Sequence, residues 1–137
     1  MGPEPGTTDE RGTGSTERWT RGTIGVLLAS IGYLLAAVVG AVTTGNAEFV
    51  IYIVVMLVLF GIIAAIHRAI RLPTPLLVAL SIWGALHMAG GLVPVPASWP
   101  IAGDQAVLYS WYILPLPFGG QLKYDQLVHA YGSVSYT

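Results

Sequence analysis

The feature that most restricts this chain is a run from Gly22 to Ala47 that contains no Asp, Glu, Lys or Arg. Within it, the stretch "TIGVLLASIGYLLAAVVGAVT" at 23–43 is long enough to cross a hydrocarbon core of about 30 Å, which takes about 20 helical residues. Arg18 and Arg21 precede the run, as basic residues precede a secretory signal peptide. Its apolar region exceeds the roughly 7–15 residues of a signal, so the run predicts a membrane-spanning helix.

Two more apolar segments follow, "FVIYIVVMLVLFGIIAAI" at 49–66 and "LLVALSIWGALHMAGGLV" at 76–93. Only Arg68 and Arg71 carry charge between them, in a loop with two prolines that ends one helix and begins the next. Of the 137 residues, 54% are hydrophobic and 9% are charged, against about a quarter charged in a soluble domain. We therefore predict an all-α, polytopic helical membrane protein with three full transmembrane helices and the start of a fourth.

The arginines predict the orientation of these helices, because cytoplasmic loops carry the Lys/Arg excess. Three arginines precede the first span and two lie between the second and third: Arg11, Arg18, Arg21, Arg68 and Arg71. Residues 1–21 are too poor in apolar side chains to pack a core and are expected to form a flexible cytoplasmic tail. We predict a multi-pass protein of the inner (plasma) membrane with residues 22–137 as its membrane domain and a cytoplasmic amino terminus.

The segment at 94–122 is expected on the outer side of the membrane. It contains five prolines, yet "VLYSWYIL" in its middle carries three aromatic residues, which favour the headgroup level. We predict a surface-lying or re-entrant segment that covers the outer end of the bundle. A partial helix at 124–137 then heads inward, but its length of about 20 Å, at 1.5 Å per residue, is too short to cross.

Charge and cysteine content exclude several classes of function. The formal net charge is −1 and the pI is near 6.2, so the chain has no basic surface for nucleic acid, and we predict no nucleic-acid partner. The lipid bilayer is the expected partner. Cysteine is absent, so any metal would need histidine and carboxylate ligands.

Small residues recur every four positions in two of the predicted helices. They are Gly32, Ala36 and Gly40 in the first helix and Ser81, Ala85 and Ala89 in the third. Small side chains let helix backbones approach closely in lipid. This pattern favours packing within one chain, and a helix–helix partner or a homo-oligomer is the alternative.

Three polar side chains stand out as a candidate site: His87 in the third predicted helix, and Asp125 and His129 in the partial helix. All three are expected at one depth near the outer surface, and a spacing of four puts Asp125 and His129 on one helix face. Two imidazoles and a carboxylate suit Zn²⁺ or another divalent metal. Asp125 and His129 would equally suit a catalytic acid/base pair, or a hydrogen bond that only satisfies both groups.

Two other features bear on this site. Gly90 and Gly91 follow His87, and adjacent glycines can open a helix and let another group reach the histidine. His67 adjoins Arg68 at the predicted cytoplasmic boundary, where an amphipathic ring is easily accommodated, so we interpret it as structural.

The ordered combination "LHMAGGLVP", "LYSWY" and "KYDQLVHAYG" resembles the YjdF-like family of small polytopic inner-membrane proteins, over about residues 76–132. The matching positions are His87, Gly90, Gly91, Tyr124, Asp125, Leu127, His129 and Gly132. The resemblance implies that His87, Asp125 and His129 act as one constellation, while the activity of the family is not established. Family members continue through further helices with acidic residues, so the resemblance implies that this chain is truncated or is completed by another polypeptide.

Three functions follow as alternatives. The first is an inner-membrane protein of unknown activity with an outer-facing His/Asp site, as the resemblance implies. The second is a metal-dependent hydrolase that acts on a lipid or membrane-embedded substrate, with water activated by a metal at the site. The third is a structural or accessory membrane subunit without catalysis.

Overall fold

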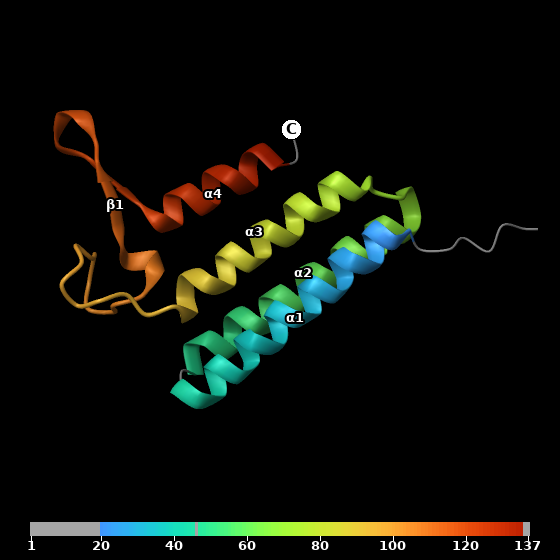
Figure 1. The fold of residues 1–137 in the computed structure, drawn as a ribbon, viewed down its shortest axis with the longest axis horizontal. Helices are drawn as coiled ribbons and strands as arrows, with labels where there is room; N and C mark the ends of the chain where they lie inside the picture. Colours follow the sequence, from blue (N-terminus) through green and yellow to red (C-terminus); the bar gives the residue numbers. More distant parts are fainter. Residues whose placement is uncertain (1–19, 46, 136–137) are drawn as a thin grey trace, which may run out of the picture.

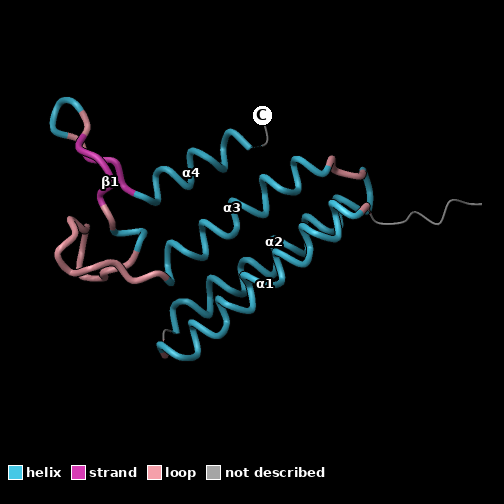
Figure 2. Tube along the Cα trace, in the orientation of Figure 1, coloured by secondary structure: helices cyan, strands magenta, loops and turns pink. Residues whose placement is uncertain are grey.

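The computed structural model describes residues 20–45 and 47–135 of the chain, so nearly all of the predicted tail lies outside the described residues. The described residues form a bundle of four helices with a small two-stranded sheet at one end (Figures 1 and 2). In chain order the elements are α1 (Arg21–Thr44), α2 (Ala47–Ile70), α3 (Thr74–Leu92), the short 3-10 helix η1 (Leu108–Ser110), β1 (Tyr112–Pro115), the 3-10 turn η2 (Pro117–Gly119), β2 (Gln121–Lys123) and α4 (Tyr124–Ser135).

Three of these helices are long and apolar enough to cross a membrane, as predicted: α1, residues Phe49–Ile70 of α2, and α3. Local signals define the ends of α1. The Thr20 side chain accepts a hydrogen bond from the backbone N–H of Thr23, and Gly45 ends the helix in the left-handed conformation with φ 63°.

The second helix continues four residues beyond its predicted end at Ile66 and includes His67 and Arg68 in its last turn. Positive side chains are favourable near a helix carboxyl end, so they extend the helix instead of ending it. The chain turns at Arg71, which has φ 55°, and Pro73 precedes α3 in an extended conformation. The predicted Pro-containing loop is therefore confirmed, but it is shorter than expected.

Helix α3 lies at the centre of the arrangement and contacts α1, α2 and α4 (Figure 1). A buried cluster from the first three helices forms the core: Ala37, Ala41, Phe49, Ile53, Met56 and Met88. This core lies in the half of the bundle nearer to the sheet.

Small residues do bring α1 against α3, but two of the three that were predicted in α1 do not take part. The buried positions Thr23, Ser30 and Ala37 recur every seven residues, and the Ser30 hydroxyl hydrogen-bonds the Ser81 hydroxyl at 2.8 Å. A seven-residue period is the seam of left-handed helix packing. Gly32 and Ala36 are exposed, so the prediction of packing within the chain is wrong for them.

Gly40 does lie on the packed side of α1, as the pattern predicted. A Cβ atom added at Gly40 would lie 2.8 Å from the Leu92 side chain of α3. At Gly32, by contrast, an added Cβ would meet nothing within 4 Å. Gly40 thus faces α3 together with the seven-residue series, whereas Gly32 does not.

The described residues are mostly helical, which is consistent with the all-α prediction, and the segment after α3 adds a small sheet that the sequence did not predict. Strands β1 and β2 pair antiparallel, with Tyr112 opposite Lys123 and Pro115 opposite Gln121. The hairpin projects beyond the end of the bundle (Figures 1 and 2). The aromatic ring of Tyr112 and the β-branched side chain of Ile113 suit a strand. The surface-lying or re-entrant position of residues 94–122 stays a prediction.

Helix α4 begins at this hairpin and runs back along α3 in the opposite direction (Figure 1). Its tyrosines anchor it. The hydroxyl of Tyr124 donates to the backbone carbonyl of Leu86 at 3.1 Å, and that of Tyr131 donates to the carbonyl of Ala79 at 3.3 Å. Tyr131 comes later in α4 than Tyr124, but its partner Ala79 comes earlier in α3 than Leu86. The two helices are therefore antiparallel, as the prediction of an inward-heading helix requires.

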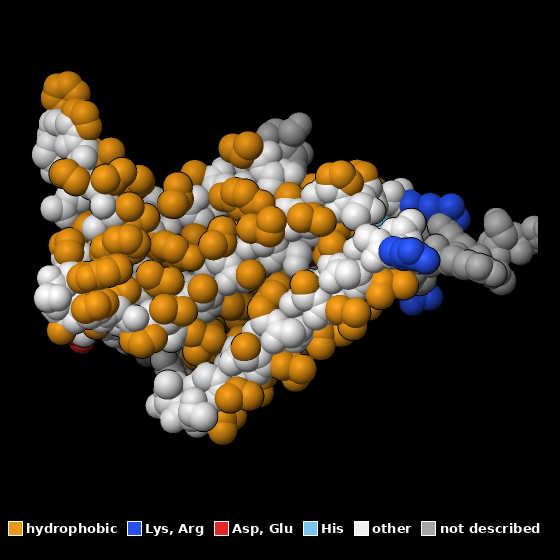
Figure 3. Space-filling model, in the orientation of Figure 1, with side chains coloured by type: hydrophobic (Ala, Val, Ile, Leu, Met, Phe, Trp, Pro, Cys, Tyr) orange, Lys and Arg blue, Asp and Glu red, His pale blue; other side chains and the backbone are white. Residues whose placement is uncertain are grey.

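The two ends of the bundle differ in charge. On the face in Figure 3, basic side chains gather where α1 begins and α2 ends, and apolar atoms cover the flank between the ends. We call the end with Arg21, Arg68 and Arg71 the arginine end, and the opposite end, with residues 93–123, the hairpin end. Long exposed apolar side chains along α1 and α2, such as Leu28 and Val55, suit lipid rather than water.

Candidate functional site

His87 lies in the half of α3 nearer to the hairpin end, among four aromatic rings from different parts of the fold. The ring centroids of these neighbours lie 5.4 Å (Tyr109 of η1), 5.6 Å (Trp83 of α3), 6.1 Å (His129 of α4) and 6.4 Å (Tyr52 of α2) from that of His87. We call these five residues the His87 cluster. The predicted approach of His87 and His129 is present in the structure.

Two glycines make this cluster sterically possible. A Cβ added at Gly90 would lie 2.5 Å from Cε1 of Tyr109, and one added at Gly132 would lie 2.5 Å from Nε1 of Trp83. Glycine is therefore required where Tyr109 crosses α3 and where Trp83 meets α4. The glycines after His87 do let another group reach it, but α3 continues to Leu92, so the expected opening of the helix does not occur.

Three buried polar atoms of the cluster find no hydrogen-bond partner among residues 20–45 and 47–135: Nδ1 of His87, Nε1 of Trp83 and the hydroxyl of Tyr109. An unsatisfied polar atom in a buried position costs roughly 1–3 kcal/mol. The indole N–H is a donor only, the phenol both donates and accepts, and the imidazole nitrogen does either according to its tautomer. Together they suit a group with hydrogen-bond-accepting oxygen atoms.

The environment of Tyr109 keeps its phenol protonated. Burial is the main cause that raises the pKa of Tyr109 above its ordinary value of 10.0, and the nearby hydroxyls of Tyr124 and Tyr52 and the carboxylate of Asp125 act in the same direction. A neutral phenol retains its O–H donor at every physiological pH.

Asp125 does not join the two histidines. It lies in the first turn of α4, where the helix dipole favours an anion, and its Oδ1 accepts a hydrogen bond from the backbone N–H of Gln126 at 2.7 Å. In the described part of the chain, no three His, Cys, Asp or Glu residues form a group that could hold a metal ion. The predicted metal site of His87, Asp125 and His129 and the catalytic pair of Asp125 and His129 thus stay predictions, with only the two imidazoles brought together.

A cavity of about 270 Å³ lies beside the cluster, between α2, α3 and the segment after α3. Tyr52 and Tyr109 belong both to its wall and to the His87 cluster. Its remaining lining is Phe49, Gly91, Ala102, Asp104, Gln105, Val107 and Ser110. A solute in this cavity would lie against the two tyrosine rings that separate it from His87.

His67 lies at the arginine end, in the last turn of α2, and has no part in the His87 cluster. Its structural interpretation stays a prediction.

Sequence reasoning missed Tyr52, Trp83 and Tyr109 as neighbours of His87. One signal was present for Trp83, which precedes His87 by four residues and so shares its helix face. Nothing local in the sequence places Tyr52 or Tyr109 there, because each comes from another element and reaches His87 only through tertiary packing.

Comparisons of the chain with known proteins return no match to any family model, curated protein or solved structure.

Proposed function

We propose that the chain is an integral inner-membrane protein of the YjdF-like type, with the arginine end in the cytoplasm and the hairpin end outside. Three helices of suitable length and hydropathy support the insertion. The arginines at one end support the orientation through the positive-inside rule.

At the outer end, the His87 cluster binds a small solute that carries hydrogen-bond-accepting oxygen atoms, such as a carboxylate. The observation that carries this proposal is the set of three buried, unpartnered polar atoms of His87, Trp83 and Tyr109 among the described residues. Buried polar groups in native proteins nearly always have a partner, so a bound oxygen-bearing group is the natural complement. The cavity walled by Tyr52 and Tyr109 lies beside the cluster, and a solute would reach His87 from it by displacing these two rings.

His87 and His129 bring two imidazoles together at the site, with ring centroids 6.1 Å apart. An imidazole nitrogen donates or accepts a hydrogen bond according to its tautomer, so the pair can meet the oxygen atoms of the solute.

The metal-dependent hydrolase has narrower support. Two imidazoles on one tetrahedral ion, with bonds of about 2.1 Å, would place their ring centroids roughly 5 Å apart, so a small movement of His87 and His129 would bring both onto an ion. Asp125, the third predicted ligand, hydrogen-bonds its own helix instead. The hydrolase is therefore the second candidate.

Acetate titration of the full chain in lipid nanodiscs tests the first candidate, with the tryptophan indoles labelled with ¹⁵N. Acetate should shift the indole signal of Trp83, which Trp83→Phe identifies by its disappearance. The ring centroids of Trp99 and Trp111 lie 4.5 Å apart, and neither ring belongs to the His87 cluster. Their signals therefore serve as internal controls. His87→Gln should weaken the response of Trp83 by about tenfold, because it removes one hydrogen-bonding partner of the ligand.

A Trp83 signal that does not respond to acetate, or that responds equally in His87→Gln, would contradict solute binding at this site. A parallel titration with Zn²⁺ alone addresses the hydrolase. Zinc that perturbs the imidazole nitrogens of both His87 and His129, and loses affinity in His129→Ala, would favour the second candidate instead.

A further inference from the structure

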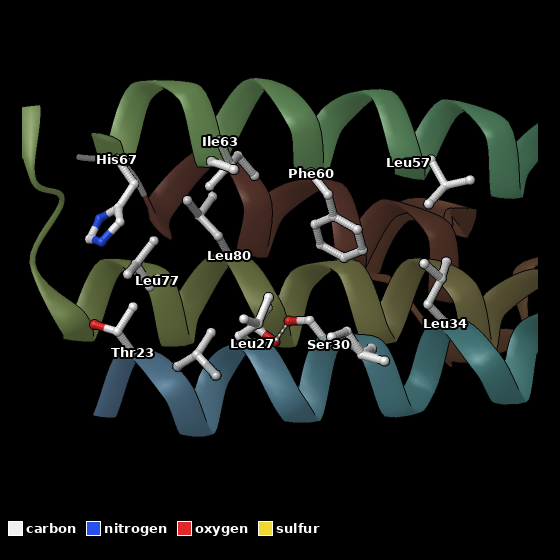
Figure 4. A pocket seen from close by; sticks show the side chains of 14 residues that line it. Thr23, Leu27, Ser30, Leu34, Leu57, Phe60, Ile63, His67, Leu77 and Leu80 are labelled. Carbon is white, nitrogen blue, oxygen red and sulfur yellow. Dashed lines mark hydrogen bonds between the residues drawn. The ribbon is translucent and has the colours of Figure 1, made fainter. Parts of the chain in front are cut away.

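A second cavity, far from the His87 cluster, lies among α1, α2 and α3 and extends to the arginine end (Figure 4). Its volume is about 280 Å³. In Figure 4, Leu57, Phe60, Ile63 and His67 point from α2 toward α1 and α3, with His67 at the same end as Thr23. Leu27, Ile31 and Leu57 also line it and are exposed at the flank, so the cavity is a groove open to the membrane.

The wall of this groove is almost entirely hydrocarbon. The two serine hydroxyls in it, Ser30 and Ser81, satisfy each other through their hydrogen bond of 2.8 Å. Along α1 the lining runs from Thr23 to Leu34, a length of roughly 16 Å at 1.5 Å per residue. Half of a hydrocarbon core is about 15 Å thick, so the groove spans one leaflet.

The end of the bundle that the groove reaches carries arginines, although none of them lines the groove itself. Arg21 begins α1, Arg68 lies in the last turn of α2, and Arg71 follows that helix. The amino-terminal ends of α1 and α3 meet at the same place, since a Cβ added at Gly22 would lie 2.8 Å from Cγ2 of Thr74. Neither helix has an acidic residue in its first turn, so two helix amino termini and the arginines favour an anion there, against the single carboxyl terminus of α2.

We propose that this groove binds one anionic phospholipid from the leaflet at the arginine end, with an acyl chain between α1, α2 and α3 and the phosphate at the arginines. The charge at the end of the groove selects this occupant over a zwitterionic lipid. The volume selects a chain over a helix, because about 280 Å³ is at the lower limit of small-ligand sites and a helix is about 10 Å across.

This inference rests on the proposed membrane insertion but not on the His87 cluster, which lies at the other end of the bundle. The two sites can therefore fail separately. Loss of lipid selectivity with an intact Trp83 response to acetate would reject only the lipid site, and the reverse result would reject only the solute site.

Native mass spectrometry of the full chain, released from nanodiscs that contain equal amounts of phosphatidylglycerol and phosphatidylcholine with matched chains, tests the lipid site. The wild-type chain should retain one phosphatidylglycerol in preference to phosphatidylcholine. Arg68→Gln should reduce this preference roughly fivefold, whereas Lys123→Gln, which removes a positive charge at the hairpin end, should leave it unchanged.

Adjacent alanines of α2 provide a matched pair for the groove itself. Ala64 lines the groove and Ala65 does not, although both are exposed. Ala64→Phe should lower lipid retention about tenfold by filling the groove, and Ala65→Phe should retain the lipid like the wild type. Circular dichroism and a single elution peak establish that both variants fold.

Equal retention of the two lipids by the wild type, or equal effects of Ala64→Phe and Ala65→Phe, would overturn the proposal. A dimer that Ala64→Phe dissociates would assign the groove to a second copy of the chain. Should Ala64→Phe not fold, phosphatidylglycerol with a photoreactive acyl chain must label the wild type at Leu27, Ile31 or Leu57. Labelling spread evenly over the exposed apolar residues of α1 and α2 would also overturn it.

Discussion

The ring of Tyr109 crosses α3 at Gly90 and reaches His87, with ring centroids 5.4 Å apart. This contact joins the segment after α3 to the candidate site, because the phenol of Tyr109 can lie there only if position 90 has no side chain. It also explains why a glycine stands three residues after His87 without breaking the helix.

Gly90→Ala should destabilise the protein by about 1–3 kcal/mol, since its methyl group would lie 2.5 Å from Cε1 of Tyr109 and force that ring away from His87. The matched control is Gly32→Ala, where the added methyl meets nothing within 4 Å and alanine favours the helix. Unfolding in mixed micelles with increasing denaturing detergent measures both variants. Equal stability of the two would show that Tyr109 does not pack on Gly90.

The imidazoles of His87 and His129 should perturb each other's NMR signals, because their ring centroids lie 6.1 Å apart in an edge-to-face arrangement. The chain has three histidines, which makes ¹⁵N imidazole spectra simple to assign. His129→Gln should shift the imidazole signals of His87, and His67→Gln, at the arginine end, should not. Unchanged His87 signals in His129→Gln would mean that the two rings do not face each other.

The stability of the protein should fall above about pH 10 partly because of Tyr109. Since burial raises the pKa of Tyr109 in the folded state, the unfolded chain releases this proton first, near the ordinary value of 10.0. The contribution of Tyr109 to the free energy of unfolding is complete below pH 10 and is lost as the pH rises toward the pKa of Tyr109 in the folded state. After solvent screening, the loss is up to about 1 kcal/mol near pH 11.

Thermal unfolding in detergent between pH 8 and about pH 11 measures this dependence. Tyr109→Phe should flatten the curve, whereas Tyr112→Phe in β1 removes a phenol outside the His87 cluster and serves as the control. A curve that both variants flatten equally would remove Tyr109 from this role.

An engineered disulfide should report the contact of α1 with α3, since the chain has no cysteine to interfere. The hydroxyl oxygens of Ser30 and Ser81 lie 2.8 Å apart, so Ser30→Cys with Ser81→Cys should cross-link on mild oxidation. Gly32→Cys with Ser81→Cys should stay reduced, because Gly32 faces away from α3. After the chain is cleaved between α1 and α3, the cross-linked fragments migrate together on a gel, which measures the yield of disulfide. Equal disulfide yields from the two cysteine pairs would contradict the packing of α1 on α3.

Part of the candidate site was evident in the residues alone. An acid and a histidine four residues apart lie on one face of any helix, and the predicted topology put His87 at the depth where the partial helix was expected to begin. Those two arguments bring His129 to His87. They say nothing of which side of α4 faces α3, and in the structure the Asp125 carboxylate accepts from the backbone N–H of Gln126.

The small-residue pattern is likewise a feature that the sequence predicts only in part. A spacing of four in α1 marks Gly32 as readily as Gly40, yet only Gly40 packs on α3. The side of an apolar helix that faces its neighbours is hard to read from hydropathy when every side is apolar. Only the docked helices distinguish the seam that contains Ser30 and Ala37 from the exposed side.

By itself the sequence determined the three helices long and apolar enough to cross a membrane, the short fourth helix and the charge difference between the ends, because these follow from hydrophobic length, charge placement and chain reach, which are local properties. The tertiary structure alone decided that Tyr52 and Tyr109 lie against His87 and what forms the groove near the arginines. These two rings reach His87 from α2 and η1 through side-chain packing. Such packing depends on how helices rotate against one another, and a linear pattern of apolar residues does not encode that rotation.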